Sequence, residues 1–257
     1  MGLAPLAKLE IRNLSISYSS KPRVHAVEDV SLVVPPGETV CLLGPSGCGK
    51  SSVLRAIAGF IRPDSGQVLV DGRLVEEPGA DRGMVFQEYA LFPWLTVSRN
   101  IEFGLRHRFP DRAQRRAVVR SWIEKVKLDG FERAYPKQLS GGMQQRVAVA
   151  RALAPDPEVL LMDEPFGALD AQTRVLMQEM LESLIYESRR AVVFVTHDID
   201  EALVIGDFLC IMSKRPGRVL EVFPNPFARP RSAHIFELKD YGPAKARIFE
   251  TIRRQIT

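Results

Sequence analysis

The stretch "GPSGCGKS", residues 44–51, decides how this chain folds. Its glycines allow backbone N–H groups to turn inward around an anion. Lys50 adds a point charge for phosphate oxygens, and the hydroxyl of Ser51 can ligate Mg²⁺. The stretch continues an apolar run, "ETVCLLG", and leads into "KSSVLRAIAGF", which has helical spacing. A buried strand, a glycine-rich loop and a helix in this order predict a phosphate-binding site.

Strands and helices alternate in the second half of the chain. The apolar runs "EVLLMDEP", "AVVFVTHD" and "DFLCIMS" predict strands buried on both faces, with helical stretches between them. This alternation predicts an α/β fold with a mostly parallel sheet covered on both sides. Near the N-terminus, "KLEIRNLSISY" and "VEDVSLVV" alternate apolar and polar residues, which predicts an antiparallel β subdomain.

The domain organisation follows from these patterns. We expect a nucleotide-binding domain over residues 1–222, with an α-helical subdomain at about 92–154, where the pattern becomes helical. Residues 223–257 are Pro-rich and then basic, and we interpret them as a C-terminal extension that ends in a short helix.

Composition narrows the class of protein. The 257 residues are 46% hydrophobic with a formal net charge of +4, which is ordinary for a globular protein and selects no partner. There is no apolar run of membrane-spanning length, and the N-terminus lacks the apolar core of a signal peptide. Three cysteines without CxxC spacing argue against a disulfide framework or a zinc site, so a reducing cytosol is expected.

Two acids end the apolar run "VLLMDEP". Asp163 lies at the C-terminal end of a predicted parallel strand, where sheets of this kind bind their ligands. Its carboxylate can hold Mg²⁺. Glu164 can take a proton from a water molecule that attacks a phosphate. The alternative for Glu164 is a solvated acid in a turn.

Three more side chains end strands of the predicted sheets. His197 follows "VVFVT" and can contact a phosphate or the attacking water, although a lone histidine is more often structural. Gln87 ends "GMVFQ" and can bind Mg²⁺ or orient water. Tyr18 ends the first strand, where it is either a ring that stacks on adenine or an ordinary surface tyrosine.

A second small glycine-rich turn, "LSGGM" at residues 139–143, leads into the helical stretch "MQQRVAVARAL". Ser140 and the N–H groups of Gly141 and Gly142 form an anion site at a helix N-terminus. An ordinary serine-capped helix is the alternative. The first loop already binds the nucleotide of this chain. We therefore interpret the second glycine-rich turn as closing on a nucleotide that is bound to another copy of the chain.

Two surface features suggest docking. Residues 106–133 hold nine Lys or Arg against four Asp or Glu, which indicates either a solvated helical face or a surface near a membrane. Phe92, Pro93 and Trp94 form either an exposed apolar patch or part of the subdomain interior.

Together these motifs, in this order and with "GALD" at residues 167–170, resemble the ATPase subunits of ATP-binding cassette (ABC) transporters. The resemblance covers the chain from Tyr18 to about Val222. It implies a P-loop NTPase core that binds ATP and Mg²⁺ and hydrolyses ATP as an ATP-dependent homodimer.

The resemblance also implies residue roles. Glu164, His197, Lys50 and Gln87 are implied to be catalytic, and Ser51, Gln87 and Asp163 to bind the metal. Ser140, Gly141, Gly142 and Met143 are implied to bind the partner's nucleotide, and Asp170 to contact the partner. The implied nucleotide-binding residues are Tyr18, Gly44, Pro45, Ser46, Gly47, Cys48, Gly49, Lys50, Ser51 and Ser52.

Two positions depart from the usual pattern. Met143 stands where the family has Gln, which removes a polar contact but keeps the start of the helix. Cys48 in the phosphate loop is expected to make ATP binding sensitive to thiol modification.

"EYALFPWLTVSRNIEFGL", "DAQTRVLMQ" and "IMSKRPGRV" are similar to the bacterial importers of nitrate, sulfonates and taurine. This similarity implies integral membrane permease subunits as partners, a periplasmic substrate-binding protein beyond them, and a peripheral place on the cytoplasmic face of the cell membrane. No nucleic acid partner is expected. The alternatives are a soluble ABC-type ATPase acting in cofactor assembly and a nucleotide-binding regulator without turnover.

Overall fold

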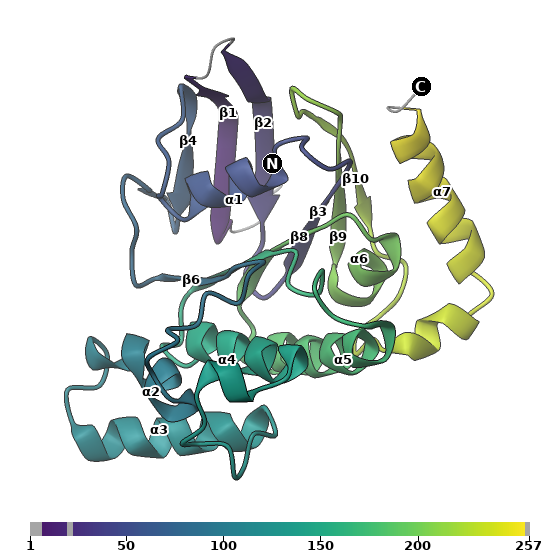
Figure 1. The fold of residues 1–257 in the computed structure, drawn as a ribbon. Coiled ribbons are helices and arrows are strands. Elements are labelled where there is room, and N and C mark those ends of the chain that lie inside the picture. The colour runs from purple at the N-terminus through teal and green to yellow at the C-terminus, as the bar shows by residue number, and fades with distance from the viewer. Residues whose placement is uncertain (1–6, 20–22, 255–257) are drawn as a thin grey trace.

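A six-stranded sheet forms the centre of the molecule, in the order β10-β9-β3-β8-β7-β6 (Figure 1). The computed structural model describes residues 7–19 and 23–254. All neighbouring pairs in this sheet are parallel except β9 and β10, which confirms the predicted mostly parallel sheet. Its strands are β3 (Thr39–Leu43), β6 (Arg82–Val85), β7 (Val159–Asp163), β8 (Ala191–Thr196), β9 (Phe208–Met212) and β10 (Val219–Pro224).

The predicted N-terminal antiparallel sheet is also confirmed. It has four strands in the order β2-β1-β4-β5, and every pair is antiparallel. Its strands are β1 (Leu9–Tyr18), β2 (Val24–Val34), β4 (Ser65–Val70) and β5 (Arg73–Leu74). Helix α1 (Lys50–Ile57) packs between this sheet and the central one, so the phosphate loop that precedes it lies between the two sheets.

The two faces of the central sheet bury two different cores, because successive side chains of a strand point to opposite sides. Val159 and Leu161 of β7 pack with α1 and the antiparallel sheet. Leu160 and Met162 of the same strand pack on the other side with the helices. Burial on both faces explains why β3, β7 and β8 are continuous apolar runs.

The helices between residues 97 and 153 lie at the end of the molecule away from the antiparallel sheet (Figure 1). They lie inside the stretch that the sequence predicts to be helical, although its limits as a subdomain remain a prediction. These elements are α2 (Val97–Glu102), the 3₁₀ turn η1 (Phe103–Arg106), α3 (Arg112–Lys125), the 3₁₀ turn η2 (Pro136–Gln138) and α4 (Gly141–Leu153).

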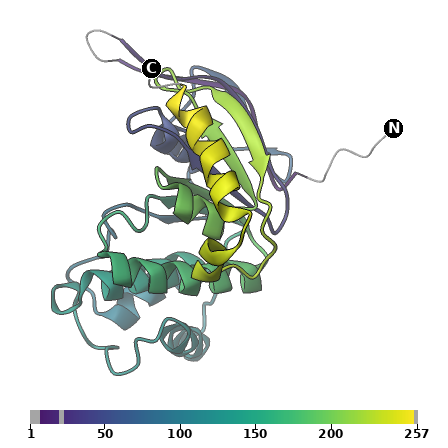
Figure 2. The same cartoon turned by 90° about the vertical axis from the view of Figure 1, so that its right-hand side faces the viewer.

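The C-terminal residues run back along the central sheet. Figure 2 shows α7 lying alongside β10, and the proposed boundary at residue 222 falls within that strand. Asp207 Oδ1 binds Arg229 Nε at 2.8 Å and Arg231 Nη2 at 2.7 Å, which ties the segment to the end of α6. The remaining elements are α5 (Ala171–Ser188), α6 (Ile199–Ile205), the 3₁₀ turn η3 (Ala233–Glu237) and α7 (Tyr241–Arg253). Across residues 7–19 and 23–254, no helix has the length and apolar character needed to span a membrane.

Candidate active site

The phosphate loop joins the fully buried strand β3 to the first turn of α1. Gly47 and Gly49 have φ angles of +75° and +107°, in the region that glycine enters without strain. A Cβ atom at Gly49 would lie 2.5 Å from the carbonyl oxygen of Ala26. A glycine at position 49 is therefore required both by its backbone angles and by the close approach of β2.

Lys50 lies inside the loop rather than in solvent. Its side chain is buried, and Nζ donates hydrogen bonds to the carbonyl oxygens of Gly44 at 2.8 Å and Pro45 at 3.0 Å. Cys48 is 1% exposed, and its thiol packs into the core between the sheets. A buried thiol is hard for a reagent to reach, so the structure argues against the expected ready modification of Cys48.

A pocket of about 430 Å³ opens beside the loop and brings together predicted residues from four strand ends. Tyr18 lines it, and its hydroxyl is hydrogen-bonded to Ser52 Oγ at 2.9 Å. Gly44, Pro45 and Cys48, which the sequence also assigned to nucleotide binding, do not line it. The lining residues are Tyr18, Val24, Ala26, Ser46, Gly47, Gly49, Lys50, Ser51, Ser52, Gln87, Glu164 and Arg215.

Asp163 and Ser51 form the part of the site suited to a metal ion. Ser51 Oγ donates a 2.8 Å hydrogen bond to Asp163 Oδ1, so their oxygens converge at the C-terminal end of β7. Burial raises the pKa of Asp163, and the hydrogen bond from Ser51 opposes that rise. One carboxylate and one hydroxyl fit Mg²⁺, which takes few protein ligands and completes its shell with phosphate oxygens and water.

Glu164 is held in an unusual backbone conformation, with φ at +43°. Its N–H donates to the carbonyl oxygen of Val195 at 3.0 Å, and its own carbonyl accepts from Gly167 N at 3.2 Å. A non-glycine residue in the left-handed region costs about 1 kcal/mol or more. The two hydrogen bonds stabilise this backbone conformation of Glu164. In this conformation its carboxylate lines the pocket.

His197 lies next to Glu164, with Nδ1 3.2 Å from Glu164 Oε2. Its neighbours in the chain fix its place at the end of β8. Thr196 Oγ1 donates to the buried carboxylate of Glu201 at 2.6 Å, and Asp198 caps the N-terminus of α6. The imidazole itself is more than half exposed and can therefore meet a ligand.

The LSGGM segment (residues 139–143) and Asp170 lie side by side, away from this pocket. Ser140 caps α4 by accepting from Met143 N at 3.3 Å, and Asp170 caps α5 by accepting from Thr173 N at 3.0 Å. A Cβ atom at Gly142 would lie 2.6 Å from Thr173 Cγ2. The Ser140 cap is a feature that this segment shares with ordinary serine-capped helices.

The sequence motifs did not predict a role for two residues that the structure places at functional positions. Arg215 lines the pocket, although the motif "IMSKRPGRV" served only to show a resemblance. Asn100 is fully buried, and its side chain bonds the backbone N–H and carbonyl of Phe92. Neither residue belongs to a motif that would reveal its role, because the segment that each one contacts is brought close only by folding.

A glycine-rich loop between a buried strand and a helix, with a serine–aspartate pair and a glutamate beside it, defines a P-loop nucleotide hydrolase. Residues 27–167 match the model of the ABC transporter family. The chain belongs to that family, which confirms the resemblance, and it is an ATP-binding ATPase.

Relatives and solved structures agree with this assignment. The chain is 47% identical to an uncharacterized ABC transporter ATP-binding protein of Methanocaldococcus jannaschii, over 91% of this chain and 88% of that protein. It is 47% identical to a taurine import ATP-binding protein of Pelagibacter ubique, over 87% and 85%. It is 44% identical to an aliphatic sulfonates import ATP-binding protein of Bacillus cereus, over 87% and 88%. A dimeric ATP-binding cassette bound to ADP and phosphate superimposes with a TM-score of 0.75 at 32% identity, covering 86% of this chain and all of that one.

Proposed function

We propose that this chain is the ATP-hydrolysing subunit of an importer and that it works with Mg²⁺ as a homodimer. The observation that carries the proposal is that Glu164, Lys50 and Ser51 line one pocket, with Asp163 bonded to Ser51. The loop N–H groups and Lys50 bind the phosphates, and Glu164 takes the proton of the attacking water. Ser51 and Asp163 would hold Mg²⁺, which would neutralise charge on the phosphate oxygens.

His197 and Gln87 complete this proposed site. The imidazole of His197 lies beside the carboxylate of Glu164, so both can meet the same water and the terminal phosphate. Gln87 lines the pocket two residues beyond the end of β6, where its amide can orient that water or contact the metal.

The dimer accounts for the residues that lie off the pocket. Ser140, Gly141, Gly142, Met143 and Asp170 do not line the pocket of their own chain. In the proposed dimer they close on the nucleotide of the partner, where the α4 N-terminus meets phosphate. The likeness to a dimeric ATP-binding cassette supports this arrangement.

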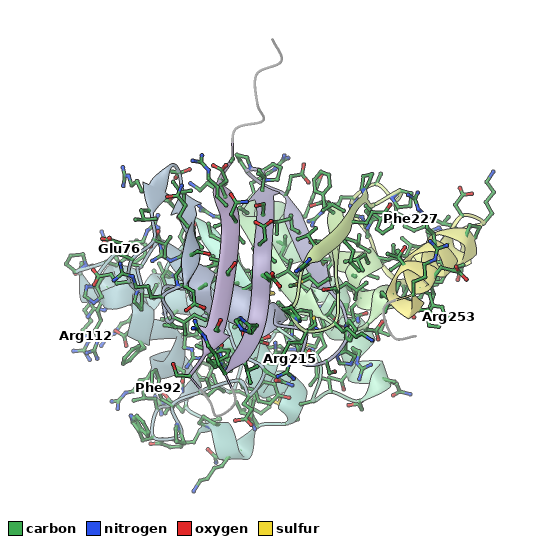
Figure 3. The ribbon with its side chains drawn as sticks, turned by 90° about the horizontal axis from the view of Figure 1, so that it is seen from above. Glu76, Phe92, Arg112, Arg215, Phe227 and Arg253 are labelled. Carbon is green, nitrogen blue, oxygen red and sulfur yellow. The ribbon has the colours of Figure 1, made fainter. Side chains whose placement is uncertain are left out.

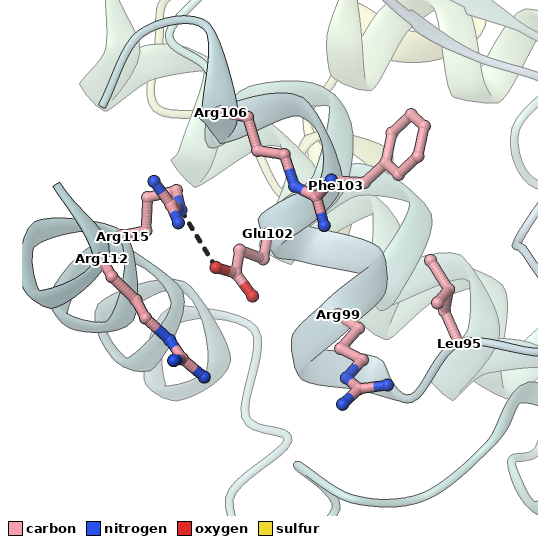
Figure 4. A pocket seen from close by; sticks show the side chains of 7 residues that line it. All are labelled: Leu95, Arg99, Glu102, Phe103, Arg106, Arg112 and Arg115. Atoms are coloured by element: carbon pink, nitrogen blue, oxygen red, sulfur yellow. Dashed lines mark hydrogen bonds and ion pairs between the residues drawn. The ribbon is translucent and has the colours of Figure 1, made fainter. Parts of the chain in front are cut away.

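The exposed aromatic surface of residues 92–103 is the proposed contact with a membrane permease. Trp94 is 69% exposed and Phe103 51%, and both rings pack against Phe92. Beside them lies a pocket of about 520 Å³, in which Arg115 is paired with Glu102 and three other arginines project (Figure 4). Its lining residues are Leu95, Arg99, Glu102, Phe103, Arg106, Arg112 and Arg115. Binding there would place the chain on the cytoplasmic face of the membrane.

The proposed solute is a small sulfonate such as taurine or an alkanesulfonate, delivered by a periplasmic binding protein. Two relatives are named as import ATP-binding proteins for these solutes. Those names support transport and do not favour the alternative of a soluble ATPase in cofactor assembly.

The hydrolytic site is tested by phosphate release from the purified chain with ATP and Mg²⁺. The Glu164→Gln variant should lose about 10²–10⁴-fold in turnover, because it lacks the general base, while still binding ATP. Turnover within threefold of the wild type would contradict the assigned role of Glu164.

Transport is tested in cells of the source organism that lack this gene. We expect uptake of labelled taurine or alkanesulfonate to return with the wild-type gene and not with the Glu164→Gln gene. Equal uptake without the gene would contradict the proposed solute class. Co-purification of a polytopic membrane protein would separate a transporter subunit from an assembly ATPase.

A further inference from the structure

We propose that Arg215 is a second cationic residue for the phosphate chain of the bound nucleotide, acting from outside the phosphate loop. Arg215 lies in the turn that joins β9 and β10, more than 160 residues after the loop (labelled in Figure 3). It lines the same pocket as Lys50 and Ser51. This inference rests on the proposed nucleotide site and assigns one more residue to it.

The turn that carries Arg215 is attached to the strand beside the phosphate loop. Gly217 N donates to the carbonyl of Ala26 at 2.9 Å, and Gly217 O accepts from Glu28 N at 3.0 Å. Ser213 Oγ accepts from Arg218 N at 2.9 Å and closes the turn on itself. The turn therefore keeps a fixed position relative to β2.

The backbone of the turn also packs directly on the phosphate loop. A Cβ atom at Gly217 would lie 2.1 Å from the carbonyl oxygen of Cys48, so only a glycine allows the two segments to approach this closely. Because Gly217 is two residues beyond Arg215, this contact fixes where the arginine side chain starts.

The guanidinium of Arg215 reaches the middle of the phosphate loop. Its Nη2 lies 3.7 Å from the position that a Cβ atom of Gly47 would take. Tyr18 lines the same pocket and is bonded to Ser52, in the first turn of α1. Since the N–H groups of such a loop surround phosphates, Arg215 faces the phosphate chain rather than the base.

Arg215 also has its hydrogen-bond donors available. It is exposed, and among residues 7–19 and 23–254 it has no side-chain hydrogen bond or ion pair. Arg218, in the same turn, is by contrast paired with Glu28 at 2.9 Å. A free guanidinium offers five N–H donors in a planar fork that suits phosphate oxygens. Lys50 donates to two loop carbonyls, whereas the donors of Arg215 have no partner within the described residues, so Arg215 adds a second cation to the one that Lys50 supplies.

The test is fluorescence titration of the purified chain with trinitrophenyl derivatives of ATP, ADP and AMP. Arg215→Ala should weaken binding of the ATP and ADP derivatives about five- to tenfold, as expected for one charge-assisted contact at an exposed site. Binding of the AMP derivative should weaken less than binding of the other two, because AMP keeps only one phosphate of the chain that Arg215 faces. Arg215→Lys should recover part of the loss, since it keeps the charge without the fork.

Lys214→Ala is the matched control, because Lys214 is the adjacent exposed cation and does not line the pocket. It should leave all three affinities unchanged. An equal loss for all three derivatives, no loss for any, or the same loss with Lys214→Ala would each overturn the role of Arg215. If the wild type binds none of the derivatives, the nucleotide site itself is wrong. If the wild type binds them and Arg215→Ala binds equally well, only this inference fails.

Discussion

Ser51 and Asp163, 112 residues apart in the chain, are joined by a 2.8 Å hydrogen bond at the centre of the site. The serine is the second residue of α1, and the aspartate ends β7, the second strand over from β3 in the central sheet. Both residues belong to elements that pack into the buried core, α1 and β7. Their side-chain oxygens are therefore held in position before any ligand binds. Such prior placement lowers the cost of ordering the site on binding.

The burial of Asp163 predicts an inverse dependence of stability on pH. Burial raises its pKa above the ordinary value of 3.8, so the folded protein holds this proton more tightly than the unfolded chain. The charged aspartate therefore lowers the free energy of unfolding as pH rises through and above that value. Asp163→Asn, measured by urea unfolding without nucleotide, should be more stable than wild type at pH 7, and the gap should close below about pH 4.

Asp170 provides the control of opposite sign. The N–H of Thr173 lowers the pKa of Asp170, so its charged form stabilises the folded protein above the ordinary pKa, and this is lost at lower pH. Asp170→Asn should lose stability at pH 7 and match wild type in acid. The account of Asp163 fails if both variants shift stability in the same direction.

The contact between His197 and Glu164 predicts a loss of rate rather than of binding. His197→Ala should lower kcat about 10²-fold and change ATP affinity less than threefold, because in the proposed site it removes the group next to Glu164, the proposed general base. His234, an exposed histidine of η3, is the matched control, and its alanine variant should keep full turnover. Steady-state phosphate release measures both, and a comparable drop in the two variants would argue against a specific role for His197.

The LSGGM segment should be sensitive to one added methyl group. In Gly142→Ala the new Cβ meets Thr173 Cγ2 at 2.6 Å, so the free energy of unfolding should fall by about 1–3 kcal/mol. Thr173→Ser removes that methyl group and should restore at least half of the loss in the double variant. Urea unfolding of the two single variants and the double variant gives the coupling energy. Strict additivity would show that the two segments are not in contact.

Asn100 should be essential for the turn that carries Phe92. It is fully buried, accepts from Phe92 N at 2.9 Å, and donates to the carbonyls of Phe92 and Leu95 at 3.2 and 3.0 Å. Asn100→Ala removes the side-chain partners of Phe92 N and of the Leu95 carbonyl, while the Phe92 carbonyl keeps its bond from Leu95 N at 3.1 Å. The loss should cost about 2–3 kcal/mol of unfolding free energy. Ser98→Ala, on the same helix, should stay within about 0.5 kcal/mol. Equal losses in the two variants would rule out the buried hydrogen bonds as the cause.

The sequence predicted the parts of the fold that depend on local pattern. The buried strands β3, β7 and β8 were recognisable because burial on both faces demands an unbroken apolar run. The phosphate loop was recognisable because its chemistry requires fixed residues at fixed spacing. Asp163 and Glu164 were predicted as site residues because ligands collect at the carboxyl ends of parallel strands. The structure places Glu164 in the pocket and bonds Asp163 to Ser51, while their roles stay predictions.

The parts that escaped prediction depend on contacts between distant segments. No spacing places Arg215 above Gly47, because that contact arises where the β9–β10 turn pairs with β2. The inward position of Cys48 and the bonds of Lys50 to its own loop depend on the folded geometry of residues 44–50. The neighbourhood of Gly142 and Thr173 likewise requires the packing of α4 against α5.

The most direct test of the account is the mass in solution of the Glu164→Gln variant, by size-exclusion chromatography with light scattering. With ATP and Mg²⁺ the mass should double from the 28.8 kDa of one chain, and adding Ser140→Arg should prevent the doubling. Without ATP the variant should remain a monomer. A variant that stays at 28.8 kDa with ATP demonstrably bound, or one that dimerises equally well with Ser140→Arg, would contradict the claim that residues 139–143 close on the nucleotide of a partner.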